Sequence, residues 1–141
     1  MDRRRKAALA YAAGFMVLTA SGAVHSAGGL DPSLAGAWTA SATDCAKLFV
    51  RQGGALAYRK PVDKFAQAAI IGPQEIRLPS SSCRVENTSR ANGAITIKAD
   101  CQDSISYTQQ TVQIKVKSSS EIVYSPTGDP ALDTTLVKCP L

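Results

Sequence analysis

Two cysteines placed symmetrically about an Asn-Gly pair constrain the fold of this chain more than any other feature. Cys83 and Cys101 are equally far from Asn92, and Asn92-Gly93 separates two segments in which apolar and polar residues alternate. Such a pattern predicts a β-hairpin, because Asn and Gly accept the positive φ angles of a tight turn. A three-residue loop over 91–93 places the two cysteines opposite each other, and we therefore predict a disulfide between them.

The start of the chain predicts export. Residues 1–6 are basic, residues 7–20 form an apolar run, and small residues follow. This layout is typical of a secretory signal peptide, and the run is shorter than the ~20 apolar residues of a membrane-spanning helix. We assign the signal peptide to residues 1–26, with the cleavage site between 23 and 27. A periplasmic or secreted bacterial protein is expected, without a membrane span in the mature chain.

The other two cysteines complete a disulfide framework. An even number of cysteines in a small exported chain indicates disulfides, and Cys45 then pairs with Cys139. The two other connectivities of four cysteines stay compatible with the sequence. Zinc is the competing interpretation, but the chain has no Cys-x-x-Cys spacing and its single histidine, His25, lies in the signal peptide. We therefore expect neither a metal nor another cofactor.

Removal of the signal peptide also changes the net charge. Residues 1–27 contain four of the 16 basic side chains and one of the 11 acidic ones, so that the remainder carries a net charge of +2. A strongly basic domain is the mark of a nucleic-acid partner, and we expect no such partner here. Without His25 the mature chain also lacks the base of the usual serine triad.

Alternating residues predict a largely β chain after a mobile segment at 27–33. Strands are expected at 34–40, 75–78, 83–89, 94–101, 104–117, 121–125 and 134–139. Within 104–117 the apolar positions change phase across Thr108–Thr111, which predicts a bulge or bend. We expect residues 34–141 to form a single β domain. Sequential hairpins favour an antiparallel meander that removes its edges by closing into a small lipocalin-like barrel.

One short helix is expected between the first two strands. Thr43 or Asp44 can cap it, and Cys45, Leu48 and Phe49 then share one face. The pair Gly53-Gly54 is the predicted end of this helix.

The segment Leu34–Trp38, followed by Ser41, resembles the L-x-G-x-W opening of small lipocalin-like and avidin-like barrels. Secreted bacterial metalloprotease inhibitors of the Inh type open similarly. Cys83–Val85 and Ile97–Cys101 resemble segments of small uncharacterised exported proteobacterial proteins. The resemblance implies a barrel closed at one end by Trp38. In the Inh type the segment before the barrel enters the protease cleft, and Gly28–Leu34 would take that place here.

Few residues suggest a site. Trp38 is interpreted as a core anchor, with the lining of a ligand pocket as the alternative. A basic group around a tyrosine is a candidate docking patch for an acidic surface or an anionic envelope polymer, with a solvated surface as the alternative. This group consists of Arg51, Tyr58, Arg59, Lys60 and Lys64.

No catalytic residue is predicted. Asp129 and Asp133 lie in one loop, and a glycosidase needs two carboxylates held across a cleft. The sequence Gly128-Asp129-Pro130 is equally typical of a turn.

These observations favour a non-enzymatic binding protein of the bacterial cell envelope, with inhibition of a hydrolase as one form of that function. The partner is then another envelope or extracellular protein. A carrier of a small apolar ligand inside the barrel is the second hypothesis, and a hydrolase that uses carboxylates alone is the third. The sequence leaves the partner's identity and the oligomeric state open.

Overall fold

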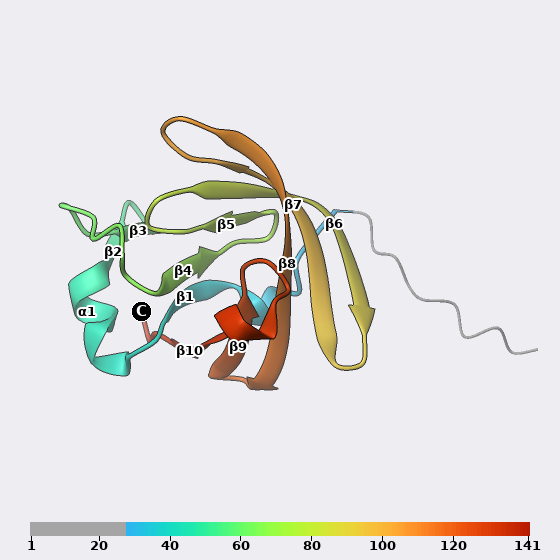
Figure 1. Cartoon of the computed structure of the whole chain (residues 1–141). Coiled ribbons are helices and arrows are strands. Elements are labelled where there is room, and N and C mark those ends of the chain that lie inside the picture. Colours follow the sequence, from blue (N-terminus) through green and yellow to red (C-terminus); the bar gives the residue numbers. More distant parts are fainter. Residues whose placement is uncertain (1–27) are drawn as a thin grey trace, which may run out of the picture.

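The computed structural model describes residues 28–141, and the predicted signal peptide lies outside this part (Figure 1). The body is a closed barrel of eight antiparallel strands in the order β1-β10-β9-β8-β7-β6-β5-β4, with β4 pairing back to β1. These strands are β1 (Gly36–Thr39), β4 (Ala68–Ile71), β5 (Glu75–Arg77), β6 (Ser82–Ala91), β7 (Ala94–Gln102), β8 (Tyr107–Ser118), β9 (Glu121–Ser125) and β10 (Thr134–Lys138). The predicted all-β barrel with one short helix is confirmed.

An insertion between β1 and β4 holds the remaining regular structure. It contains the 3-10 turn η2 (Ala42–Asp44), the helix α1 (Cys45–Leu48) and a two-stranded sheet of β2 (Phe49–Gln52) and β3 (Ala55–Tyr58). Two further 3-10 turns are η1 (Pro32–Leu34) before β1 and η3 (Pro130–Leu132) before β10. Within residues 28–141 no helix has the length and apolar character needed to cross a membrane.

The antiparallel order divides the connections between two ends of the barrel. We call one end the mouth; it carries the insertion at 40–67 and the loops 78–81, 103–106 and 126–133. We call the other end the base; it carries residues 28–35 and the turns 72–74, 92–93 and 119–120. In Figure 1 the insertion and the tip of the β7–β8 hairpin lie on the left, and the chain enters the barrel from the right.

The barrel interior is a continuous apolar core. Alternate residues of β7 face it, as the sequence predicts, and β7 is buried at Ile95, Ile97, Ala99 and Cys101. Trp38 of β1 lies in the same core and is only 1% exposed. Apolar burial at ~25 cal/mol per Å² makes such a core the main source of stability.

A second apolar cluster lies against the outside of the wall. It joins Cys45 and Phe49 of the insertion to Ala37 of β1, Ala68 and Ile70 of β4, and Cys139. Strand β4 is therefore buried at all four positions, because one face meets the interior and the other meets the insertion. This two-sided burial explains why Ala68–Ile71 shows no alternation in the sequence.

Both predicted disulfides are present. Cys45 is bonded to Cys139, which ties α1 to the chain end, and Cys83 is bonded to Cys101 across β6 and β7. The predicted three-residue loop at this hairpin is wrong. Ala91 pairs with Ala94, so the turn is Asn92-Gly93, with φ of 53° and 74°. A bulge between Val85 and Asn87 then shifts the register by the residue needed to bring the cysteines opposite each other.

Two further sequence predictions are corrected. The helix ends at Leu48, and Gly53-Gly54, both with positive φ, form the turn between β2 and β3. A glycine pair serves a hairpin turn as well as a helix end, so the motif alone did not decide. Of the bulge or bend predicted across Thr108–Thr111, the bulge is absent, since the register of β8 with β7 is unbroken from Tyr107 to Lys115. Its register shift lies instead at the base end, next to Ser118.

Residues 28–34 pack against the base, although mobility was expected for 27–33. Leu30 is buried, and its N–H donates to the carbonyl of Pro73 at 2.7 Å. The indole Nε1 of Trp38 donates to the carbonyl of Leu34 at 2.8 Å. Asp31 caps η1 by accepting the N–H of Ser33, and it forms an ion pair with Arg90 of β6.

These bonds to Asp31 predict that the base end of the barrel loses stability in acid. The N–H of Ser33, followed by Arg90, lowers the pKa of the Asp31 carboxyl from 3.8 to about 2. A lowered pKa means that the carboxylate contributes to stability above pH ~4, and that this contribution is lost as the pH falls through 2. We expect the carboxyl carbon of Asp31 to titrate near pH 2 by NMR, accompanied by the amide of Leu30. Titration near 3.8 would show that these bonds are absent in solution.

Candidate binding site at the barrel mouth

The basic group predicted around Tyr58 does not form one free surface. The ring of Tyr58 packs against Phe49 at 5.3 Å between centroids, and its hydroxyl donates to the carbonyl of Arg77 at 2.9 Å. Burial raises the pKa of this phenol well above its usual value. Tyr58 therefore helps to fasten the insertion to the barrel.

The two arginines of that group also hold the insertion in place. Arg51 donates to the carbonyls of Gly54 and Leu141, at 3.1 and 2.7 Å. Arg59 donates through Nε to the carbonyl of Ala46 at 3.1 Å. Of the five predicted residues, only Lys60 and Lys64 make no hydrogen bond or ion pair to the part of the chain that the structure describes. Their charges are thus the ones left available to a partner.

The mouth carries most of the exposed large apolar side chains among residues 28–141. Phe65, in the insertion, is 94% exposed, and Ile105, in the loop between β7 and β8, is 93% exposed. Tyr107 begins β8 and is 63% exposed, and Leu132 of η3 is 51% exposed. Exposed apolar side chains that share one end of a molecule, unlike scattered ones, are typical of a binding surface.

None of these four residues was predicted to belong to a site. Ile105 and Tyr107 fall within the strand that was predicted at 104–117. The register shows why they are exposed: β9 ends with Ser125 opposite Gln113, so the β7–β8 hairpin extends beyond its neighbour (Figure 1). This part of β8 pairs with β7 on one side and has no β9 on the other, and its residues Tyr107–Thr111 are all exposed.

An aspartate fixes the backbone just before the apolar residue in two of the mouth loops. Asp63 accepts the N–H of Phe65 at 3.0 Å. Asp103 accepts the N–H groups of Ile105 and Ser106 at 2.8 and 2.7 Å, and these bonds lower the pKa of its carboxyl. Such Asx turns hold a loop in one conformation. The spacing Asp-x-apolar is therefore the sequence signal that could have identified both residues.

A third mouth loop follows a related pattern. Asp129 caps η3 by accepting the N–H of Ala131 at 2.9 Å, two residues after it, and Leu132 follows. The other carboxylate of this loop, Asp133, lies with Oδ2 3.8 Å from Nζ of Lys115. The two carboxylates thus have separate partners in the fold. Asp129 serves turn chemistry, as one of the two sequence interpretations expected.

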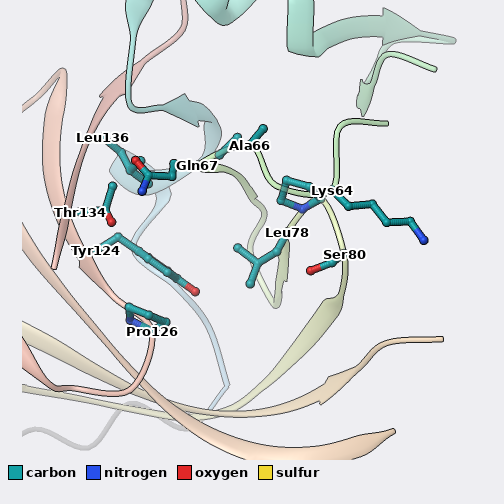
Figure 2. Close-up of a pocket in the computed structure, with 11 residues that line it drawn as sticks. Lys64, Ala66, Gln67, Leu78, Ser80, Tyr124, Pro126, Thr134 and Leu136 are labelled. Atoms are coloured by element: carbon teal, nitrogen blue, oxygen red, sulfur yellow. The ribbon is translucent and has the colours of Figure 1, made fainter. Parts of the chain in front are cut away.

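A cavity of about 190 Å³ opens at the mouth (Figure 2). Its walls are mostly apolar, and it is lined by Lys64, Ala66, Gln67, Ala68, Leu78, Pro79, Ser80, Tyr124, Pro126, Thr134 and Leu136. Figure 2 shows the hydroxyl of Tyr124 pointing toward the middle of this cavity, while the ammonium of Lys64 extends away from it. The lining residues come from the insertion, from the first residue of β4, from the loop 78–81 and from β9, β10 and the loop between them.

Tyr124 is one of the polar residues that line this cavity, and its hydroxyl points into it. Its side chain belongs to the interior core and is 7% exposed, and burial raises the pKa of its phenol to about 12. The phenol is consequently neutral at pH 7 and can donate a hydrogen bond. Its hydroxyl has no hydrogen-bond partner among residues 28–141.

The fold and the mouth together define a small β-barrel with two disulfides, a packed interior and exposed apolar side chains at one end. In comparisons with protein-family models, curated proteins and solved structures, nothing matched this chain. Among the described residues, no three His, Cys, Asp or Glu side chains form a group that could hold a metal ion.

Proposed function

We propose that this protein is an exported, non-enzymatic binding protein of the bacterial cell envelope that docks on another protein through the mouth of its barrel. The observation that carries the proposal is the nearly complete exposure of Phe65 and Ile105, each on a loop held by an aspartate. Exposing a large apolar side chain to water is unfavourable, whereas burying it at an interface is favourable.

The rigidity of the loops supports this proposal. A loop that is ordered before binding loses less conformational entropy when the complex forms. Binding residues are commonly found on loops that a rigid scaffold positions, and here the scaffold is a closed barrel with two disulfides. The disulfides also agree with an oxidising compartment such as the periplasm. Inhibition of a hydrolase is the specific form of binding that we propose to test first.

The test is capture of a partner by the tagged, oxidised mature protein. The extract is an envelope fraction supplemented with lysozyme and a secreted metalloprotease. We expect one partner to form a stoichiometric complex. If no protein is retained, the inhibitor form is wrong for these two enzymes, and a binding function in the envelope loses its support.

Substitutions at the mouth test whether the partner binds there. F65D and I105D should each weaken the complex at least tenfold, because truncating or charging a central anchor costs 2 kcal/mol or more. Both should leave the free energy of unfolding within about 0.5 kcal/mol of the parent, since the side chains are exposed. Binding is measured by titration calorimetry and stability by urea unfolding.

V116D is the matched control. Val116 is also an exposed apolar residue, 45% exposed, but it lies near the base end of β8. It should leave the affinity unchanged. Equal losses in V116D and F65D would contradict a binding surface at the mouth.

A further inference from the structure

We infer that the mouth cavity is the pocket for a single apolar side chain of the partner, an aromatic one of phenylalanine or tyrosine size. This inference rests on the proposed function and names the group on the partner that the mouth recognises.

The size of the cavity points to one side chain. An apolar cavity of about 150 Å³ holds a benzene molecule, and this one measures about 190 Å³. Sites for drug-sized ligands have volumes of about 300–1,000 Å³. A ring therefore fits, whereas a drug-sized molecule exceeds the volume of this cavity.

The position of the cavity points to a group attached to a protein. Lys64 and Ala66 line it, and the residue between them is the exposed Phe65. On another side, Pro126 and Thr134 line it, and the loop that joins them carries the exposed Leu132. A partner that covers Phe65 and Leu132 would therefore contact segments that line the cavity. A free ligand would fill the cavity and leave both exposed residues in water.

The chemistry inside the cavity favours a phenylalanine side chain, which has no polar atom, or a tyrosine side chain, which has a hydroxyl at the tip of its ring. Leu78, Leu136 and Pro126 supply apolar walls. The neutral hydroxyl of Tyr124 points inward and can bond to a phenol oxygen (Figure 2). The ammonium of Lys64 extends away from the opening, so the pocket itself presents no charge. A charged side chain would lose its hydration without gaining a partner.

The experiment uses the side chains of phenylalanine and tyrosine as free probes, toluene and p-cresol. Each is titrated into the oxidised mature protein, and NMR follows the methyl groups of Leu78 and Leu136. We expect saturable shifts at these methyls with both probes. Absence of saturation up to the solubility limit of toluene would overturn the inference.

Two variants locate the probes. S80W places a bulky ring at the rim, where Ser80 is exposed, and it should abolish the binding of both probes. S104W is its matched control, because Ser104 is also an exposed serine at the mouth end but does not line the cavity. Y124F should weaken p-cresol several-fold and leave toluene unchanged, since it removes only the hydroxyl. Shifts that persist in S80W would overturn the inference.

The partner complex separates failure of this inference from failure of the proposed function. S80W should weaken the complex at least tenfold, and S119W, at an exposed serine of the turn 119–120 at the base, should leave it unchanged. A complex that tolerates S80W but not F65D leaves the docking function standing and overturns the pocket's role in it. Probe binding without any partner complex overturns both, and it would reassign the cavity to a free small ligand.

Discussion

Replacing Cys45 and Cys139 by alanine should lower the free energy of unfolding by about 4.7 kcal/mol, the chain-entropy value for a loop near 100 residues. The bond joins residues 94 positions apart, so it restricts most of the unfolded domain. Both half-cystines are buried in the outer cluster, and alanine removes little apolar volume there. Urea unfolding followed by far-UV circular dichroism measures the loss.

The second disulfide provides the comparison. C83A with C101A opens a loop of only 18 positions, for which the same relation gives about 3 kcal/mol. The Asn92-Gly93 turn also keeps these two strands together in the absence of the bond. The order of the two losses is the result to check. A larger loss from the short loop would contradict the entropic explanation.

The long disulfide also lies beside one of the two shortest seams of the barrel. Strand β1 pairs with β10 at only two positions, Trp38 with Lys138 and Thr39 with Val137, whereas β6 and β7 pair at nine. Cys139 continues this seam, since its N–H donates to the carbonyl of Ala37 at 2.8 Å. We therefore expect faster hydrogen exchange in β10 than in β7 when the Cys45–Cys139 bond is removed.

The parts of the fold that the sequence predicts are those with one buried face. In β7 the residues Ile95, Ile97 and Ala99 alternate with polar residues. The turn before them has positive φ at both residues, which Asn and Gly accept. The single buried face and the symmetric spacing of Cys83 and Cys101 about Asn92 were enough to identify the cysteine pair. The bulge near Glu86 could not be predicted, because one extra residue in the turn and one extra residue in β6 both bring Cys83 opposite Cys101.

The insertion could not be predicted in the same way. Strand β4 is buried on both faces, and its four apolar residues are equally compatible with a buried helix. The contact between Phe49 and Tyr58 that organises the insertion joins two short strands through a glycine turn. Nothing in the spacing distinguishes such a turn from a helix end.

The candidate site was missed for a related reason. Apolar residues such as Ile105 were expected to be buried, and burial depends on whether a neighbouring strand covers them. That neighbour is β9, and it ends before it reaches this part of β8. The charged residues of the predicted patch were visible in the sequence, but their bonds to backbone carbonyls were not. Exposure and pairing are properties of the assembled barrel.

Replacing Trp38 by alanine should cost about 3–5 kcal/mol, the range for a large aromatic residue removed from a core. Trp38 is 1% exposed and lies among the interior residues of the barrel. It also acts on the base, because its indole donates to the carbonyl of Leu34. The variant therefore loses core volume and the bond that holds residues 28–34. Unfolding is followed by circular dichroism rather than by tryptophan fluorescence, because Trp38 is the one tryptophan of the chain.

W38F separates these two effects. Phenylalanine keeps an aromatic ring in the core but leaves the carbonyl of Leu34 without its donor, which costs about 1–3 kcal/mol for a buried group. L132A, at an exposed position of the mouth, should change stability by less than about 0.5 kcal/mol. If W38A costs no more than L132A, Trp38 is not a core anchor. If W38F lowers the free energy of unfolding as much as W38A does, the hydrogen bond to Leu34 contributes more than the packing of the ring. The segment 28–34 is then held mainly through this single hydrogen bond.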